Sequence, residues 1–313
     1  MRIAVFGTGG IGGYFGARLA QAGDEVVLIA RGAHLAAIQA HGLYVESPTG
    51  DFQMTPSLVT NRPEAVGVVD VVLLGVKAWD VRTAAEAMRP MIGATTGVLT
   101  LQNGVEAPAN VADVLGEEHV IVGGALVRSL LTGPGRLRHV GGAEPNLTLG
   151  EINNRASERV EHLRAALGKV NVTVNVPNNI HGWLWAKFIV AAAVGGVGAM
   201  VQVPTGIWRQ IPEVRDMTER AARETLAVAL ARDVRPPEGI IDQLKAAIDA
   251  VPPGHMTSLH EDMLGGRPSE LEYWTGAVVR LGREAGVPTP VNEFIYHSLL
   301  PRERQARGQL SGL

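Results

Sequence analysis

Residues 1–31 read MRIAVFGTGGIGGYFGARLAQAGDEVVLIAR, and this stretch decides the fold of the chain. Residues 2–6 are a short apolar run that ends in glycines, which is typical of a buried strand. A helical pattern follows over residues 11–22 and stops at Gly23, and residues 26–30 form a second apolar run. Strand, helix and strand in this order predict a βαβ unit of a parallel sheet.

The turn between the first strand and the helix fits the pattern G-x-G-x-x-G. Its residues are Gly7, Thr8, Gly9, Gly10, Ile11 and Gly12. A chain with 38 glycines produces such matches by chance, but the place of this one between a strand and a helix makes it specific. We expect Gly7 to permit the tight turn, Gly9 to let the backbone approach a pyrophosphate, and Gly12 to let helix and strand pack closely. The turn therefore predicts a dinucleotide site.

The end of the second strand indicates which dinucleotide binds. Enzymes that use NAD place Asp or Glu there, where it accepts a hydrogen bond from the ribose 2′-hydroxyl. This chain has Arg31 instead, and a guanidinium can pair with a 2′-phosphate, which a carboxylate would repel. The sequence therefore favours NADP(H), with a solvated surface arginine as the alternative reading of Arg31.

The rest of the chain predicts two domains. Further strand-like runs lie at 66–74, 98–101 and 120–124, with helical patterns at 81–88 and 108–115, and antiparallel edge strands are expected at 137–140 and 146–149. Beyond residue 177 helical patterns take over, at 179–201, 212–233, 237–250, 256–264 and 270–285. The predicted fold is α/β: an N-terminal Rossmann-type doubly wound sheet over 1–177, then an all-helical C-terminal domain over 178–313. Pro177 and Asn178 are the expected hinge, and residues 302–313 are expected to be frayed.

Composition excludes several classes of protein. The net charge of −3 offers no basic excess to neutralise nucleic acid, and 0 cysteines exclude disulfides and a cysteine nucleophile. The N-terminus lacks the apolar core of a signal peptide, so a cytoplasmic location is expected. The apolar run 188–201 is shorter than the ~20 residues of a membrane span, so we expect a buried helix and no membrane contact.

Three polar residues occupy places where chemistry is expected. Lys77 and Asn103 each follow a buried strand, and ligands of open α/β sheets bind beyond the carboxyl ends of strands. An ordinary surface lysine and an Asn-Gly turn are the alternatives. Lys187 lies in an apolar helical run, where a lysine must be desolvated, paired or reaching for solvent. Desolvation would lower its pKa towards the range in which it can act as an acid.

Taken in order, these segments resemble the ketopantoate reductase (2-dehydropantoate 2-reductase) family over nearly the whole chain. The resemblance rests on the glycine-rich opening, Arg31-Gly32 with His34-Leu35, Lys77-Ala78-Trp79, Asn103-Gly104, Trp185 with Lys187, and a late pair, Ser258 and Glu270. It implies the NADPH-dependent reduction of ketopantoate to pantoate, or of a related 2-keto acid, and a place in pantothenate biosynthesis. A small-molecule keto acid is thus the expected partner, and a homodimer is a candidate assembly.

The resemblance also implies roles for single residues. Lys187 would protonate the carbonyl oxygen of the substrate while hydride arrives from NADPH. Glu270 would bind the substrate's hydroxyl group and Ser258 its carboxylate. Lys77 and Asn103 would lie between cofactor and substrate. Hydride addition builds negative charge on the carbonyl oxygen, and a nearby ammonium both stabilises that charge and supplies the proton.

The chain departs from the family at two positions. The family usually has asparagines four and eight residues after the helical lysine, on the same helix face, where they help to hold the substrate. This chain has Ala191 and Gly195 there. We expect a pocket wall that is small and apolar, and hence a substrate that is bulkier or less polar than ketopantoate.

Two other readings remain open on the sequence. One is an NAD(P)-dependent β-hydroxyacid dehydrogenase that works in the oxidative direction, and the other is a non-catalytic NADP(H)-binding protein. Metal chemistry is not expected, because the 9 histidines show no ligand spacing. His260, beside Glu261 and Asp262, is interpreted as part of a surface cluster on a helix.

Overall fold

The structure is a computed structural model that describes residues 1–140 and 144–310. The chain divides into two compact units. The N-terminal unit comprises residues 1–102 and 106–180, and the helical unit comprises residues 103–105 and 181–313, of which 311–313 lie outside the described residues. The sequence prediction placed the boundary at 177 and did not separate Asn103 from the N-terminal domain.

The N-terminal unit is built on an eight-stranded sheet. Its strands, in spatial order, are β12 (Thr173–Asn175), β11 (Asn146–Glu151), β8 (Val120–Leu126), β7 (Gly97–Thr100), β6 (Val71–Leu74), β1 (Arg2–Phe6), β2 (Glu25–Ile29) and β5 (Leu58–Thr60). Every neighbouring pair is parallel except β8 and β11. The order changes direction beside β1, which is where such sheets bind their ligands.

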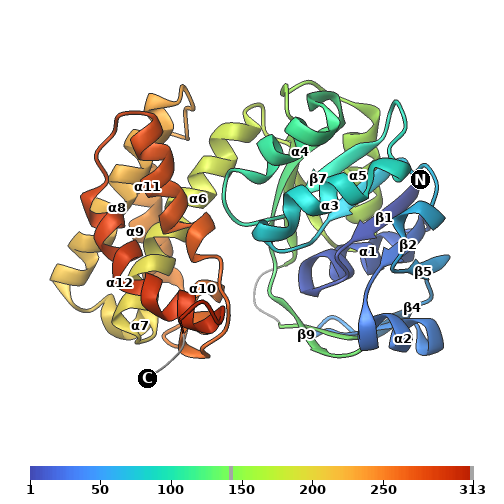
Figure 1. The fold of residues 1–313 in the computed structure, drawn as a ribbon, viewed down its shortest axis with the longest axis horizontal. Coiled ribbons are helices and arrows are strands. Elements are labelled where there is room, and N and C mark those ends of the chain that lie inside the picture. Colours follow the sequence, from blue (N-terminus) through green and yellow to red (C-terminus); the bar gives the residue numbers. More distant parts are fainter. Residues whose placement is uncertain (141–143, 311–313) are drawn as a thin grey trace. The chain divides into compact units, whose positions relative to one another are not determined.

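Helices cover both faces of this sheet, as Figure 1 shows. They are α1 (Gly10–Gln21), α2 (Gly32–His41), α3 (Val81–Ala87), α4 (Ala107–Leu115) and α5 (Glu158–Gly168), with short 3-10 helices η1 (Pro63–Ala65), η2 (Ala78–Asp80), η3 (Arg89–Met91) and η4 (Glu117–His119). Successive side chains of a strand point to opposite faces. Ile3 and Val5 accordingly pack in one core with α1 and α5, while Ala4 between them is equally buried on the other face. A sheet buried on both faces explains why its strands are continuously apolar.

A second, four-stranded sheet has the order β4 (Phe52–Met54), β3 (Leu43–Glu46), β10 (Arg136–His139) and β9 (Ser129–Gly133). The prediction that residues 137–140 belong to the edge of the main sheet is therefore wrong. Leu137 of β10 is buried against α1, so this small sheet covers the outer side of that helix. The antiparallel strand predicted at 146–149 is confirmed as β11, but it lies inside the main sheet because β12 forms the edge.

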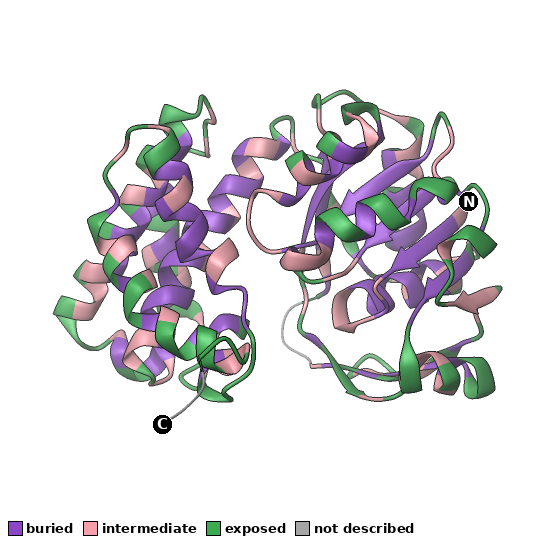
Figure 2. Ribbon diagram, in the orientation of Figure 1, coloured by how far each residue is buried: buried purple, intermediate pink, exposed green. Residues whose placement is uncertain are grey.

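The helical unit surrounds one long apolar helix, α6 (Ile180–Val201). Its other helices are α7 (Thr205–Trp208), α8 (Pro212–Ala231), α9 (Ile240–Ala250), α10 (Ser258–Leu264), the 3-10 helix η5 (Leu271–Tyr273), α11 (Thr275–Glu284) and α12 (Pro290–Ala306). Ile189 and Ala193 of α6 belong to one hydrophobic core, and Phe188 and Ala192 to another, so α6 is buried on more than one side (Figure 2). Among the described residues α6 alone is long and apolar enough to cross a membrane, and 72% of its most apolar window is buried inside the structure.

Two predictions about the helical unit are wrong. The helix expected over 270–285 is interrupted at Trp274, whose backbone angles of φ −110° and ψ −99° end η5 before α11 begins. The chain expected to be frayed from residue 302 continues as α12 to Ala306. Its Glu303 is buried because it accepts hydrogen bonds from Ser269 and pairs with Arg307.

Candidate active site

The glycine-rich turn has the geometry that its sequence predicts. Gly7 has φ +95°, and a Cβ on it would lie 2.7 Å from the backbone nitrogen of Val76. A Cβ on Gly12 would lie 2.4 Å from the carbonyl oxygen of Gly7, so only glycine allows α1 to pack this closely on the turn. Apart from its neighbours in the chain, no described atom lies within 4 Å of a Cβ on Gly9. The turn thus leaves an open backbone face beside the N-terminus of α1, which suits a pyrophosphate.

Thr8 and His34 hold this turn in place. The Thr8 hydroxyl donates to the carbonyl oxygen of Ile29 at 2.9 Å, which links the turn to β2. His34 Nδ1 accepts from the backbone N–H of Gly135 at 2.9 Å, so Nε2 carries the proton and donates to the Thr8 carbonyl oxygen at 2.8 Å. Burial lowers the pKa of His34, which keeps this tautomer neutral. The role of His34 had no signal in the sequence beyond the resemblance.

A cavity of about 240 Å³ lies beside the end of β2 in the N-terminal unit. It is lined by Phe6, Ile29, Arg31, Asn61, Pro63, Val76, Asp80, Thr83, Ala84 and Ala87. The apolar floor and polar rim suit the adenosine part of a dinucleotide. Arg31 is exposed there, and Asp80 adds a carboxylate to the same rim. Asn61, Asp80 and Thr83 were not predicted from the sequence, because they come from two separate segments that only the fold joins.

The carboxyl ends of β6 and β7 are tied together by Gln102. Its buried amide donates to the carbonyl oxygens of Leu74 and Val76, at 2.8 and 2.9 Å. This pair of bonds fixes the chain that leads into Lys77. Lys77 itself is exposed, with its Nζ 5.8 Å from the centre of the Trp79 ring. Its place at the end of a central strand is the one from which side chains reach bound ligands in such sheets.

In the helical unit, two of the predicted residues, Asn103 and Glu270, lie close to Lys187. The Lys187 ammonium donates a hydrogen bond to Asn103 Oδ1 at 2.9 Å, although 84 residues separate them in sequence. Lys187 is partly buried, and desolvation lowers its pKa from 10.5 to about 8, while the negative charge of Glu270 acts in the opposite direction. Glu270 is itself 6% exposed. A partly buried lysine with a lowered pKa, beside an amide and a carboxylate, is able to give up a proton near neutral pH.

Ser258, the predicted ligand of a substrate carboxylate, is the first residue of α10 and is exposed. The preceding residue, Thr257, caps the helix by accepting from the backbone N–H of His260 at 3.3 Å. The Thr257 hydroxyl lies 3.4 Å from the position of a Cβ on Gly195. The turn that carries Ser258 therefore lies next to the face of α6 that carries Lys187.

The two positions that depart from the family differ in their surroundings. Ala191 is partly buried, one turn after Lys187. A Cβ on Gly195, however, would lie only 2.4 Å from Cζ3 of Trp274. The indole fills the space that a longer side chain at position 195 would need. The expectation of a roomier pocket at Gly195 is thus not met, because Trp274 occupies that room.

The histidine cluster expected on the surface of α10 is also different in the structure. His260 is 1% exposed, and its ring lies beside Gly198 of α6. Within residues 1–140 and 144–310, no group of three or more histidine, aspartate or glutamate side chains is placed to hold a metal ion.

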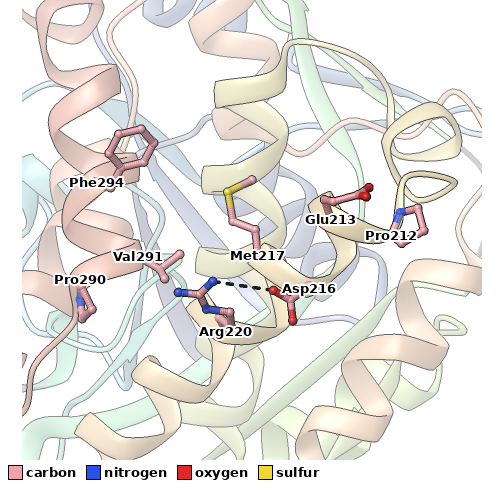
Figure 3. Close-up of a pocket in the computed structure, with 8 residues that line it drawn as sticks. All are labelled: Pro212, Glu213, Asp216, Met217, Arg220, Pro290, Val291 and Phe294. Carbon is pink, nitrogen blue, oxygen red and sulfur yellow. Dashed lines mark ion pairs between the residues drawn. The ribbon is translucent and has the colours of Figure 1, made fainter.

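A further cavity, of about 700 Å³, opens on the surface of the helical unit between α8 and α12 (Figure 3). It is lined by Pro212, Glu213, Asp216, Met217, Arg220, Pro290, Val291 and Phe294. Arg220 pairs with Asp216 at 3.7 Å, and both side chains are exposed. None of the predicted site residues lines this cavity, and we assign it no part in the chemistry.

A Rossmann-type sheet with a glycine-rich turn, and a partly buried lysine beside a carboxylate, are typical of a nicotinamide-dependent oxidoreductase. The profile described as ketopantoate reductase PanE/ApbA matches residues 3–154, and that of the C-terminal part of the same family matches residues 179–303.

Known relatives match the sequence of this chain over nearly its whole length. A 2-dehydropantoate 2-reductase of Mesorhizobium japonicum is 31% identical, over 94% of this chain and 95% of its own length. A 2-dehydropantoate 2-reductase of Halobacterium salinarum is also 31% identical, over 93% of this chain and 95% of its own length. The crystal structure of a PanE/ApbA family ketopantoate reductase from Ralstonia eutropha superposes with a TM-score of 0.88 and 32% identity, covering 98% of this chain and 100% of that one. The chain belongs to the ketopantoate reductase family, which confirms the resemblance, the fold class and the assignment as an oxidoreductase.

Proposed function

We propose that this chain reduces a 2-keto acid to the 2-hydroxy acid with NADPH, and that ketopantoate is the first substrate to test. The observation that carries the proposal is the Lys187 site. An ammonium with a pKa of about 8, hydrogen-bonded to Asn103 and close to the charge of Glu270, is protonated at neutral pH and can give its proton up. The names of the full-length relatives support the substrate class.

Each residue has a defined task in this reaction. When bound, the reduced nicotinamide supplies the hydride. Lys187 stabilises the negative charge that develops on the substrate's carbonyl oxygen and donates the proton to it. Asn103 holds the ammonium in place through its amide oxygen, which as a neutral acceptor lets the lysine remain acidic. Glu270 keeps Lys187 in its charged form before reaction and accepts a hydrogen bond from a hydroxyl group of the substrate.

The cofactor choice rests on Arg31. The open backbone at Gly9 and the cavity beside β2 fit a dinucleotide, and Arg31 on the rim of that cavity suits a 2′-phosphate. Asp80 on the same rim opposes a phosphate, so the preference for NADPH depends on the guanidinium. Lys77, at the end of β6, is proposed to contact the cofactor near its reactive end.

The substrate's own groups are proposed to meet Ser258 and Glu270. The exposed Ser258 hydroxyl is proposed to bind the carboxylate of the substrate, and Glu270 to bind a hydroxyl group. Because Ala191 offers no amide and Trp274 covers Gly195, binding of a polar hydroxy-keto acid relies on fewer hydrogen bonds than in relatives with asparagine at these positions. We therefore expect lower activity on ketopantoate than on a 2-keto acid with a less polar side chain.

We place the reaction in the cytoplasm, in line with the absence of cysteine from the sequence.

The test is NADPH consumption by the purified protein with ketopantoate and with 2-keto acids whose side chains are graded in size and polarity. Turnover of at least one 2-keto acid supports the proposal, and the ranking identifies the preferred side chain. If the protein binds NADPH but consumes it with none of these 2-keto acids, the proposed function is refuted. The chain would then be a dinucleotide-binding protein without this activity.

A further inference from the structure

The segment that carries Glu270 is fixed at its start by a buried network. The backbone N–H of Ser269 donates to Glu303 at 3.1 Å, and the Ser269 hydroxyl donates to the same carboxylate at 2.5 Å. The Ser269 carbonyl oxygen accepts from Arg307 at 2.7 Å. Glu303 is 4% exposed. This network joins the residue before Glu270 to the last turns of α12 and leaves it little freedom to move.

The end of the same segment is fixed in another way, by glycines of α6. A Cβ on Gly195 would lie 2.4 Å from Cζ3 and 2.8 Å from Cε3 of Trp274. A Cβ on the next residue, Gly196, would lie 2.6 Å from the methyl carbon of Thr275. Real Cβ atoms do not approach other atoms this closely, so two successive side chains fit against α6 only because two successive residues there are glycine. Glycine is less favourable than alanine in a helix, so packing against Trp274 and Thr275 must offset this cost.

The middle of the segment contacts the turn that holds Lys187. Gly104 has φ +102°, and a Cβ on it would lie 3.0 Å from the carbonyl oxygen of Tyr273. The residue before Gly104 is Asn103, which accepts the hydrogen bond of Lys187. Residues 270–275 are therefore in contact with both elements that hold the lysine, namely α6 and the Asn103 turn.

Trp274 is the side chain that sets this arrangement. It is 3% exposed, and its Nε1 donates to no residue that the structure describes, so the indole is held by its shape and not by a hydrogen bond. Its six-membered ring is the part that lies on Gly195. The backbone of Trp274 has ψ −99°, which breaks the helix at this residue. The break separates the segment that carries Glu270 from α11.

We propose that Trp274 is a positioning residue: seated on Gly195, it fixes the carboxylate of Glu270 relative to Lys187 and Asn103. The inference rests on the proposed function, since it assigns a role in the same site. It also explains the departure at position 195. Position 195 serves packing in this chain, because the Trp274 indole occupies the space that a longer side chain there would need.

The test compares two buried tryptophans of the same unit. Trp274→Leu is the test variant and Trp208→Leu the matched control. Trp208 is likewise buried, with an Nε1 that lacks a described partner, and it lies beside Gly198 of α6, where Trp274 lies beside Gly195. Both variants lose packing. Only Trp274→Leu is expected to lower kcat for the best 2-keto acid, by about tenfold to a hundredfold, which is the effect of misplacing a catalytic group by ~1 Å. The KM for NADPH should change less than about twofold in both.

A second readout separates positioning from mere stability. Glu270 raises the pKa of Lys187, so a displaced carboxylate lets that pKa fall, and the loss of activity at high pH should begin at lower pH in Trp274→Leu than in wild type. Trp274→Phe, which keeps an aromatic ring, should recover part of kcat and of the pH profile. Gly195→Ala should act in the same direction as Trp274→Leu, and the two effects should not add, because both break one contact.

Unchanged kcat and pH profile in folded Trp274→Leu would overturn the inference, and so would equal losses in Trp208→Leu. If Trp274→Leu does not fold, Gly195→Ala and Trp274→Phe provide the same comparison. Titration of Lys187 by NMR needs no substrate. An unchanged pKa there contradicts the role of Trp274, whereas failure of wild type to reduce any 2-keto acid contradicts the proposed function alone.

Discussion

Replacing Lys187 with methionine should make the protein more stable at neutral pH while abolishing its activity. Burial lowers the pKa of this lysine from 10.5 to about 8, which means that the folded protein holds the charged form less favourably than the unfolded chain does. Methionine has a similar length and no charge to desolvate. The site is thus expected to carry a stability cost that its function requires.

The size of the effect follows from the two pKa values. Their difference corresponds to about 3 kcal/mol against the folded state at pH 7, where the lysine is charged in both states. Between pH 8 and 10.5 the unfolded chain binds more protons than the folded one, so the stability of wild type rises with pH in that window. About 2 kcal/mol of the advantage of Lys187→Met should therefore disappear between pH 7 and ~9.5.

Urea unfolding of wild type and Lys187→Met across this pH range measures the advantage directly. Part of the stability advantage of Lys187→Met is offset at every pH, because Asn103 loses its hydrogen bond. The decisive quantity is therefore how the difference in unfolding free energy between the two proteins changes with pH. Lys169→Met, at an exposed lysine, is the control and should show a flat difference. A flat difference for Lys187→Met as well would refute the desolvation of Lys187, and with it the reasoning that makes this residue an acid.

Three further changes test other parts of the site. Arg31→Ala should weaken NADPH binding about ten- to a hundredfold, the worth of a charge-assisted contact, and leave NADH unchanged; equal binding of both cofactors by wild type would contradict the role of Arg31. Ser258→Ala should raise the KM for the keto acid about three- to tenfold at constant stability, and an unaltered KM would remove Ser258 from the site. Glu303→Ala should destabilise the protein by about 1–3 kcal/mol in urea, because it leaves the Ser269 N–H unpaired; an unaffected midpoint would contradict the buried network.

The local features of the cofactor site were predictable from the sequence. The glycine pattern between a strand and a helix depends on neighbours in the chain, so the tight turn at Gly7 and the close packing at Gly12 follow from it. Arg31 at the strand end is equally local. Asp80 on the rim of the same cavity is not, since it comes from a different βα connection and only the sheet order brings it beside Arg31.

The Lys187 site was predictable in its residues but not in its contacts. An apolar helix with one lysine indicates desolvation, and the pKa of about 8 agrees with it. The position of Trp274 was not predictable, because residues 270–285 have a continuous helical pattern, whereas in the structure the helix breaks at Trp274 and the indole packs on Gly195. A glycine in a helix signals a close neighbour, but the sequence does not identify that neighbour.

The edges of both units were the least predictable. Residues 136–139 alternate in burial like a sheet strand, and nothing local tells that they pair with β3 and β9 instead of the main sheet. Residues 302–306 are polar in sequence, yet Glu303 is buried by partners at Ser269 and Arg307. In both cases contacts with residues distant in sequence decide the structure, and local secondary-structure propensity does not predict those contacts.

The most direct test of the proposed chemistry is the pH profile of keto-acid reduction by wild type and by Lys187→Ala, with saturating NADPH. If Lys187 is the proton donor, wild-type turnover falls as pH rises through about 8, because the lysine loses the proton that it must give. Lys187→Ala should bind NADPH normally and lose turnover by about 100- to 10,000-fold at pH 7, with that limb of the profile gone. Turnover by Lys187→Ala close to that of wild type, with the same decline above pH 8, would contradict the account.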